Sequence, residues 1–197
     1  LSGVLHLCNS GQATWQTYGQ TVALSQFSHQ FSPGKVHALL RSTSARILRT
    51  DSEDGGKTWA DVDAPAINGE KYHFNAIARL RDGRMAVVGE HGLVGLSSDG
   101  SDWQRIALRY EGSLFGVLPL GEHGMVVFGM RGNVYVSDAP ETGQWTKVET
   151  ATTSSLFAGA LSGEDAILVG ADGVILRISG SQRKASVIKA KSLNRDQ

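Results

Sequence analysis

Histidine and glutamate stand side by side twice in the sequence, in Gly-Glu-His-Gly tetrapeptides at 89–92 and 121–124. Both side chains can bind zinc, so the repetition raises the question of a metal site. The first copy falls between the second and third strands of the repeat described below, whereas the other falls between a first and a second strand. Turns of these two kinds project from opposite edges of a sheet, which argues against one shared site. We therefore expect neither a metal nor another cofactor.

Paired carboxylates are the second chemistry to consider, because glycoside hydrolases place two of them, or a tyrosine with an acidic partner, on a sugar-sized cleft. The acidic residues of this chain fall mostly in predicted turns, such as Asp82, Asp99 and Asp172, and no pair stands out by its spacing. Phosphate-binding loops of the type G-x-x-x-x-G-K-[S/T], nucleophile elbows and H-E-x-x-H motifs are absent from the sequence. We therefore expect no catalytic residues in this chain.

Arginines form two local clusters. The members are Arg79, Arg81 and Arg84 in the first cluster, and Arg41, Arg46 and Arg49 in the second. A guanidinium group can form bidentate bonds with a carboxylate, so either cluster can bind an acidic segment of a partner protein. The alternative is a solvated rim without a partner. Arg79 and Arg81 can share one strand face, but Arg84 joins them only if the hairpin at Asp82-Gly83 is tight.

Composition excludes several other classes of partner. The 197 residues include 19 Lys and Arg and 19 Asp and Glu, so no global field attracts the protein to nucleic acid or to an anionic membrane. The apolar runs are as long as strands, and none approaches the roughly 18 residues that insert across a bilayer. Cys8 is the only cysteine, which excludes an intrachain disulfide. We expect a protein partner and no small-molecule substrate.

One complete copy of the Asp-box (BNR) motif, S-x-D-x-G-x-T-W, spans residues 52–59. Its fixed positions are Ser52, Asp54, Gly56, Thr58 and Trp59. Degenerate copies end at Trp103, with Asp99 in the box, and at Trp145. A short Asp side chain can accept bonds from the backbone N–H groups of its own turn, and the Trp can pack over that turn. We expect these residues to stabilise the fold and not to bind calcium or sugar.

The boxes belong to a repeat of about 42 residues. The tryptophans at 15, 59, 103 and 145 are spaced by 44, 44 and 42 residues, and apolar runs that start at Phe74, Phe115 and Phe157 are spaced by 41 and 42. Each unit has four short apolar runs, and a glycine pair marks the turn between the second and third: Gly89 and Gly92, Gly129 and Gly132, Gly170 and Gly173. Glycine allows the positive φ of a tight hairpin. Four antiparallel strands on this period predict an all-β fold built of β-propeller blades.

About four and a half blades fit the chain. We expect one propeller domain over 1–190, with a half-blade at 1–20, blades at about 27–65, 74–108, 114–150 and 156–190, and a polar tail at 191–197. Gly3 precedes Trp15 as Gly92 precedes Trp103, so the chain opens inside a blade. Either the half-blade completes the last unit and closes a five-bladed ring, or the chain is part of a six- or seven-bladed propeller. The second arrangement is favoured because the last unit has four strands of its own.

With the preceding G-x-x-G hairpin, the Asp box makes the repeat resemble that of the photosystem II assembly and stability factor family, whose propellers repeat G-x-x-G-x-I-x-x-S-x-D-G-G-x-T-W. The resemblance covers nearly the whole chain and includes relatives from bacteria that do not photosynthesise. It implies a non-catalytic scaffold, periplasmic or lumenal, that binds a partner protein and helps to assemble a membrane complex. Only the box at 52–59 is complete, which favours membership of the family over the photosynthetic role itself.

Asp boxes also occur in sialidases and other glycoside hydrolases, which leaves an enzyme as the alternative. Sialidases hold the substrate carboxylate with three arginines and carry an Arg-Ile-Pro segment. No Arg-Ile-Pro occurs in this sequence. In this alternative, the catalytic residues lie mostly outside the 197 residues.

Overall fold

The computed structural model is all-β, as the repeat predicts. It describes residues 64–69 and 72–188, together with the backbone of the strand residues 5–8, 15–18, 24–32, 35–42, 47–52 and 60–62. Within these residues the one α-helix, α1 (Pro65–Asn68), is a single turn. None of the described helices has the length and apolar character needed to span a bilayer.

Four antiparallel sheets of four strands follow one another along the chain. Blade 1 contains β3 (Leu24–Ser32), β4 (Lys35–Ser42), β5 (Ile47–Ser52) and β6 (Ala60–Val62). Blade 2 contains β7 (Phe74–Arg79), β8 (Met85–Gly89), β9 (Val94–Ser97) and β10 (Trp103–Arg105). Blade 3 contains β11 (Leu114–Leu120), β12 (Gly124–Gly129), β13 (Val134–Ser137) and β14 (Thr146–Val148). Blade 4 contains β15 (Leu156–Ser162), β16 (Asp165–Gly170), β17 (Ile175–Ile178) and β18 (Ala185–Val187), and the 3₁₀ turns are η1 (Met130–Gly132), η2 (Pro140–Thr142) and η3 (Ala171–Gly173).

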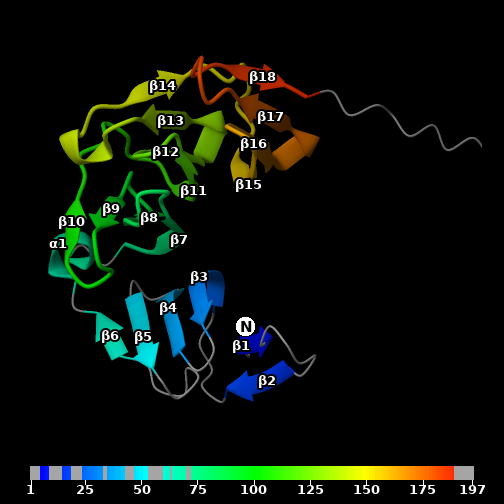
Figure 1. The fold of residues 1–197 in the computed structure, drawn as a ribbon. Coiled ribbons are helices and arrows are strands. Elements are labelled where there is room, and N and C mark those ends of the chain that lie inside the picture. Colours follow the sequence, from blue (N-terminus) through cyan, green and yellow to red (C-terminus); the bar gives the residue numbers. More distant parts are fainter. Residues whose placement is uncertain are drawn as a thin grey trace, which may run out of the picture.

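The blades fan around one centre in an open arc, with β3, β7, β11 and β15 innermost and β6, β10, β14 and β18 outermost (Figure 1). β1 (Leu5–Cys8) and β2 (Trp15–Tyr18) form a separate two-stranded sheet. Cys8 pairs with Trp15 there, as Ser97 pairs with Trp103 in blade 2, so this hairpin corresponds to the last two strands of a blade. Among the described strands, it adds none to the sheet of blade 4, so these strands do not close a five-bladed ring.

The inner strands of blades 2, 3 and 4 carry a bulge at the same place. Phe74, Leu114 and Leu156 pair with the first glycine of each glycine pair, and the residue after each of them is bulged. The bulged residues are Asn75, Phe115 and Phe157, so the alignment of Phe74 with Phe115 and Phe157 is wrong by one residue. An aromatic side chain occupies the buried pairing position in blade 2 and the bulge in blades 3 and 4. The rings of Phe115 and Phe157 contact each other, with their centroids 5.4 Å apart.

Each glycine pair forms the predicted hairpin between the second and third strands. The residue before the second glycine also has positive φ, at His91 (51°), Arg131 (55°) and Asp172 (56°). Two successive left-handed residues match the right-handed twist of the flanking strands. A Cβ on Gly92 or Gly132 would overlap the carbonyl oxygen of Tyr110 or Thr152, in the segment that leads to the next blade. Glycine is therefore required there by the close approach as well as by φ.

Apolar side chains pack between neighbouring blades, and this packing forms the core. Between blades 2 and 3, Val88, Val94 and Leu96 pack against residues that include Val117 and Val127. The next interface is formed in the same way. Val126, Phe128 and Val134 of blade 3 pack against Leu168 and Leu176 of blade 4. Because β8 and β12 are buried along their whole length, they read in the sequence as continuous apolar runs and not as alternating ones.

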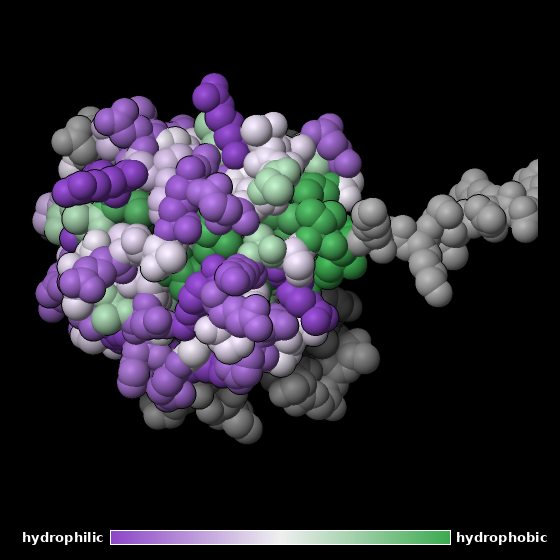
Figure 2. Space-filling model, turned by 90° about the horizontal axis from the view of Figure 1, so that it is seen from above, coloured by the Kyte–Doolittle hydropathy of each residue, from purple (hydrophilic) through white to green (hydrophobic). Residues whose placement is uncertain are grey.

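The other face of blade 4 is exposed. Ile167 and Val169 stand where blade 3 has the buried Val126 and Phe128, but Val169 is 40% exposed. Within the described residues, five of the six exposed large hydrophobic side chains lie in blade 4 or directly after it: Phe157, Leu161, Val169, Val187 and Ile188. Figure 2 shows hydrophobic residues gathered on the side of the molecule where blade 4 ends the arc.

A side chain at a glycine of these hairpins has two costs: the strain of positive φ and overlap with the neighbouring chain. Comparing Gly92 with Gly173 separates the two costs. Both have positive φ, at 62° and 69°, but a Cβ on Gly173 would meet no atom within 4 Å. Gly173→Ala should cost about 1–2 kcal/mol for the left-handed conformation alone. Gly92→Ala should cost about 1–3 kcal/mol more, because the carbonyl of Tyr110 must move. Equilibrium denaturation of the two variants measures this difference, and equal losses of stability would contradict it.

Candidate functional site

Two rims of the arc carry the turns. Rim A carries two turns of each blade: the turn between its first and second strands, and the turn between its third and fourth strands. The described turns of rim A are residues 80–84, 98–102, 121–123, 138–145, 163–164 and 179–184. Rim B carries the glycine hairpins. The described members of the first arginine cluster and of the Asp boxes lie on or beside rim A. Asp54, Gly56, Thr58, Trp59 and Arg46 lie outside the described residues, and for Ser52, Arg41 and Arg49 only the strand backbone is described.

Asp99 organises the turn between β9 and β10. Its Oδ1 accepts the backbone N–H groups of Ser101 (2.8 Å) and Asp102 (3.0 Å). Ser97 Oγ accepts the N–H of Gly100 at 2.8 Å. The buried Trp103 covers the turn, and its indole N–H donates to the carbonyl of Gly100 at 3.1 Å. The degenerate box of blade 2 therefore has the capping geometry that the motif predicts.

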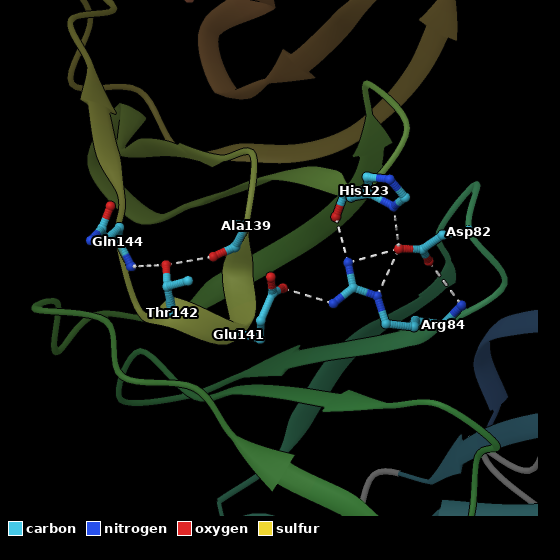
Figure 3. A network of polar contacts seen from close by, with 7 residues as sticks. All are labelled: Asp82, Arg84, His123, Ala139, Glu141, Thr142 and Gln144. Carbon is cyan, nitrogen blue, oxygen red and sulfur yellow. Dashed lines mark hydrogen bonds and ion pairs between the residues drawn. The ribbon is translucent and has the colours of Figure 1, made fainter.

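The box of blade 3 is built differently. The hydroxyl of Thr142 donates to the carbonyl of Ala139 and accepts the N–H of Gln144 (Figure 3). Asp138 instead points to Arg183 of blade 4 and forms an ion pair with it. Trp145 directly precedes β14, and its indole N–H donates to the carbonyl of Ala107 in the segment after blade 2. Here the box residues join neighbouring blades.

Arg84 is the centre of a polar network on rim A, which Figure 3 shows. Its Nε donates to Asp82 (2.7 Å), its Nη1 to Glu141 of blade 3 (2.8 Å) and its Nη2 to the carbonyl of His123 (2.7 Å). Asp82 also accepts the backbone N–H of Arg84, which makes the hairpin tight, and its Oδ2 lies 3.2 Å from His123 Nδ1. The side chains of Arg84 and Asp82 are only 21% and 14% exposed. Arg84 therefore joins blade 2 to blade 3.

The network holds both of its carboxylates ionised. Burial opposes the ionised form of Asp82, but the bonds from Arg84 and His123 outweigh burial and lower the pKa of Asp82. The hydrogen bond from Arg84 lowers the pKa of Glu141. Burial also opposes the charge of Arg84, yet its two carboxylate partners raise its pKa further. The single positive charge of Arg84 is thus shared by two carboxylates.

Arg81 makes a different kind of contact. Its Nη1 donates to both carboxylate oxygens of Glu164, at 3.1 and 3.3 Å, although the two residues are 83 positions apart. Glu164 lies in the turn between β15 and β16, so this pair connects blade 2 with blade 4. The side chain of Arg81 is 34% exposed and that of Glu164 is 72% exposed. Arg79 is exposed at the end of β7.

The two Gly-Glu-His-Gly segments lie on opposite rims, as predicted. His91 is on rim B and stacks on Tyr72, with ring centroids 4.4 Å apart. His123 is on rim A, beside Asp82. In the part of the chain that the structure describes, no three His, Cys, Asp or Glu side chains are grouped as a metal site would require.

Sequence reasoning missed the partners of the arginines. Glu141, His123 and Glu164 reach rim A from turns 39 to 83 residues away, and no local spacing indicates these pairings. It also missed a depression on rim B that is lined by His91, Leu108, Arg109, Tyr110 and Glu111. Burial raises the pKa of Tyr110, whose hydroxyl donates to the carbonyl of Met130.

Comparison with known proteins gives one family. The family described as photosynthesis system II assembly factor YCF48 matches residues 8–181. Among solved structures, YCF48 from Cyanidioschyzon merolae is 21% identical, with a TM-score of 0.66, and the match covers 91% of this chain and 61% of that one. A structure of YCF48 bound to D1 peptide is 20% identical, with a TM-score of 0.65 and coverages of 86% and 54%. This chain therefore spans less than two thirds of either.

A fold of this kind is also shared with an enzyme. A puromycin hydrolase structure matches with a TM-score of 0.62 at 14% identity, covering 90% of this chain and 30% of that one. At such identities the structural matches show the fold alone. No curated protein matches the sequence.

Asp99 and Asp102 provide a matched test of the capping role. Asp99→Ala leaves two backbone N–H groups of the turn without their acceptor, so it should lower the free energy of unfolding by about 1–2 kcal/mol. Asp102→Ala, at an exposed position of the same turn, should change it by less than about 0.5 kcal/mol. Calorimetric melting of both variants checks this, and equal melting temperatures would contradict the capping role. Asp54→Ala in the complete box should behave as Asp99→Ala does.

Arg84 should contribute stability that depends on pH. Because the pKa values of Asp82 and Glu141 are lowered in the folded protein, their contribution is present above the unfolded values near 4 and is lost as the pH falls through the folded values. Arg84→Ala should cost about 2 kcal/mol at pH 7, and this loss should shrink towards pH 3. Arg81→Ala, which breaks an exposed pair, should cost no more than about 1 kcal/mol. A loss for Arg84→Ala that stays constant from pH 7 to pH 3 would rule out the network as its source.

Proposed function

Because this chain belongs to the family of the photosynthesis system II assembly factor YCF48, we propose that it is a non-catalytic β-propeller scaffold that binds a partner protein and helps to assemble a membrane complex. The match over residues 8–181 is the observation that carries the proposal. A periplasmic or lumenal location is part of it. A relative of the same fold was solved with a D1 peptide bound, which supports a protein segment as the ligand.

Rim A is the proposed binding surface. It carries Arg79, Arg81 and Arg84 on one hairpin of a rigid blade, where guanidinium groups lose little freedom on pairing with carboxylates. The second arginine cluster, Arg41, Arg46 and Arg49, is the next candidate. Because Arg84 holds two blades together, its replacement would weaken binding and stability at once. Arg79 and Arg81 are therefore the residues to test first.

A glycoside hydrolase remains the competing proposal, and no observation on the described residues favours it. The puromycin hydrolase shares the fold only, and Glu141 and Glu164 of rim A are paired with arginines. Binding without turnover is the behaviour that the described geometry supports best.

Titration with a synthetic D1 peptide tests the proposed function. We expect binding that weakens as salt is raised, because exposed charges are screened. Arg79→Ala with Arg81→Ala should weaken it several-fold at low salt and leave the melting temperature within a few degrees, since rim charges act mainly on encounter and specificity. Lys147→Ala with Arg105→Ala, at exposed positions of the outer strands β14 and β10, is the control for net charge.

The enzyme alternative is tested in parallel with fluorogenic sialosides and glucosides. Turnover of any of these substrates by the purified protein would overturn the scaffold proposal, whereas co-purification with a membrane complex would support it.

A further inference from the structure

The ion pair between Arg81 and Glu164 shows how rim A can take up a carboxylate. Arg81 Nη1 contacts both oxygens of the Glu164 carboxylate, and Nη2 lies 3.5 Å from the neighbouring carbonyl of Gly163. We propose that Arg81 is the carboxylate-binding residue of rim A, and that Glu164 occupies it until a carboxylate of the partner protein replaces it. This inference rests on the proposed function and specifies the chemistry of the partner at that site.

Arg84 does not compete for this role. All three nitrogens of its guanidinium group already donate, to two carboxylates and one carbonyl, and its side chain is 21% exposed. A partner carboxylate would have to break the junction of blades 2 and 3 to reach it. Arg81, by contrast, holds one carboxylate that is 72% exposed. An incoming carboxylate can therefore displace the partner of Arg81 but not the partners of Arg84.

Displacement of Glu164 costs little. Exposed ion pairs contribute little stability because water solvates both charges well. The side chain of Glu164 is 72% exposed, so it can leave Arg81 for solvent without disturbing packed residues. The carboxylate of the partner then replaces that of Glu164 on the guanidinium group of Arg81. Further contacts between the partner and the protein make this exchange favourable.

Glu164 is the residue whose charge should oppose binding. Glu164→Gln keeps the shape of the side chain and removes the competing charge. It should tighten binding of the D1 peptide about two- to five-fold, the worth of an exposed pair. In an Arg81→Ala background the same substitution should have no effect, because nothing remains for the two carboxylates to compete for. Isothermal titration of the wild type, both single variants and the double variant measures this coupling.

Asp138→Asn is the matched control. Asp138 is 73% exposed, lies on the same rim and is paired with one arginine, Arg183, so its substitution changes the net charge equally without touching Arg81. It should leave peptide affinity unchanged. A peptide with an amidated C-terminus distinguishes the two sources of a carboxylate: loss of the Glu164→Gln effect identifies the terminal carboxylate, and its persistence identifies an acidic side chain.

The outcomes separate this inference from the proposed function. Tightening by Glu164→Gln that requires Arg81 supports the inference. Equal affinities for wild type and Glu164→Gln, or equal tightening in the Arg81→Ala background or by Asp138→Asn, would overturn it while peptide binding itself stands. Absence of binding by every variant would instead reject the proposed function, and the inference with it.

Discussion

Blades 2 and 3 are thin sheets with apolar side chains on both faces, and a sheet of this kind is stable only when other layers cover it. The side chains of β8 and β12 are buried along their whole length, and apolar clusters lie on both faces of blades 2 and 3. This stacking makes the rest of the architecture necessary. The strands must be short, the turns must be tight, and the chain must pass from the outer strand of one blade to the inner strand of the next without leaving a gap. The positions of the glycine pairs and of the bulges follow from that passage.

Contacts at the two rims add to the packing between neighbouring blades. Where the chain enters a new blade, it passes so close to the preceding hairpin that Gly92 and Gly132 leave no room for a side chain. On the opposite rim, polar side chains link blades whose apolar faces already meet: Arg84 connects blades 2 and 3, and Trp145 donates to the segment after blade 2. These contacts are local in space but distant in sequence. They fix how one blade sits on the next, which apolar packing alone specifies less sharply.

The fold could be predicted from the sequence because its pattern repeats from blade to blade. Features that do not repeat could not be predicted. Every blade repeats the same pairing, so glycine pairs and tryptophans at a common period are enough to indicate the strands and the capping at Asp99. The bulge made one position misleading in the sequence. Phe74 and Phe157 look equivalent there, yet Phe74 is fully buried and Phe157 is 53% exposed. The partners of the arginines were beyond sequence reasoning altogether. Glu141 and Glu164 belong to no repeated pattern, and only the stacking of blades brings them to the hairpin of Arg81 and Arg84.

Blade 4 departs from the apolar pattern on one of its faces. On the face that blades 2 and 3 use to cover their successors, blade 4 replaces Leu96 and Val136 by Arg177, and Leu120 by Ser162. Arg177 lies 3.8 Å from Asp165, so a pair of opposite charges stands at the edge of an otherwise apolar face. Whatever covers this face must accommodate a polar edge that the inner interfaces lack. The larger six- or seven-bladed propeller stays a prediction, and it requires a neighbour whose own face carries polar groups opposite Arg177 and Asp165, because burying that pair without hydrogen-bonding partners would cost more than its attraction returns.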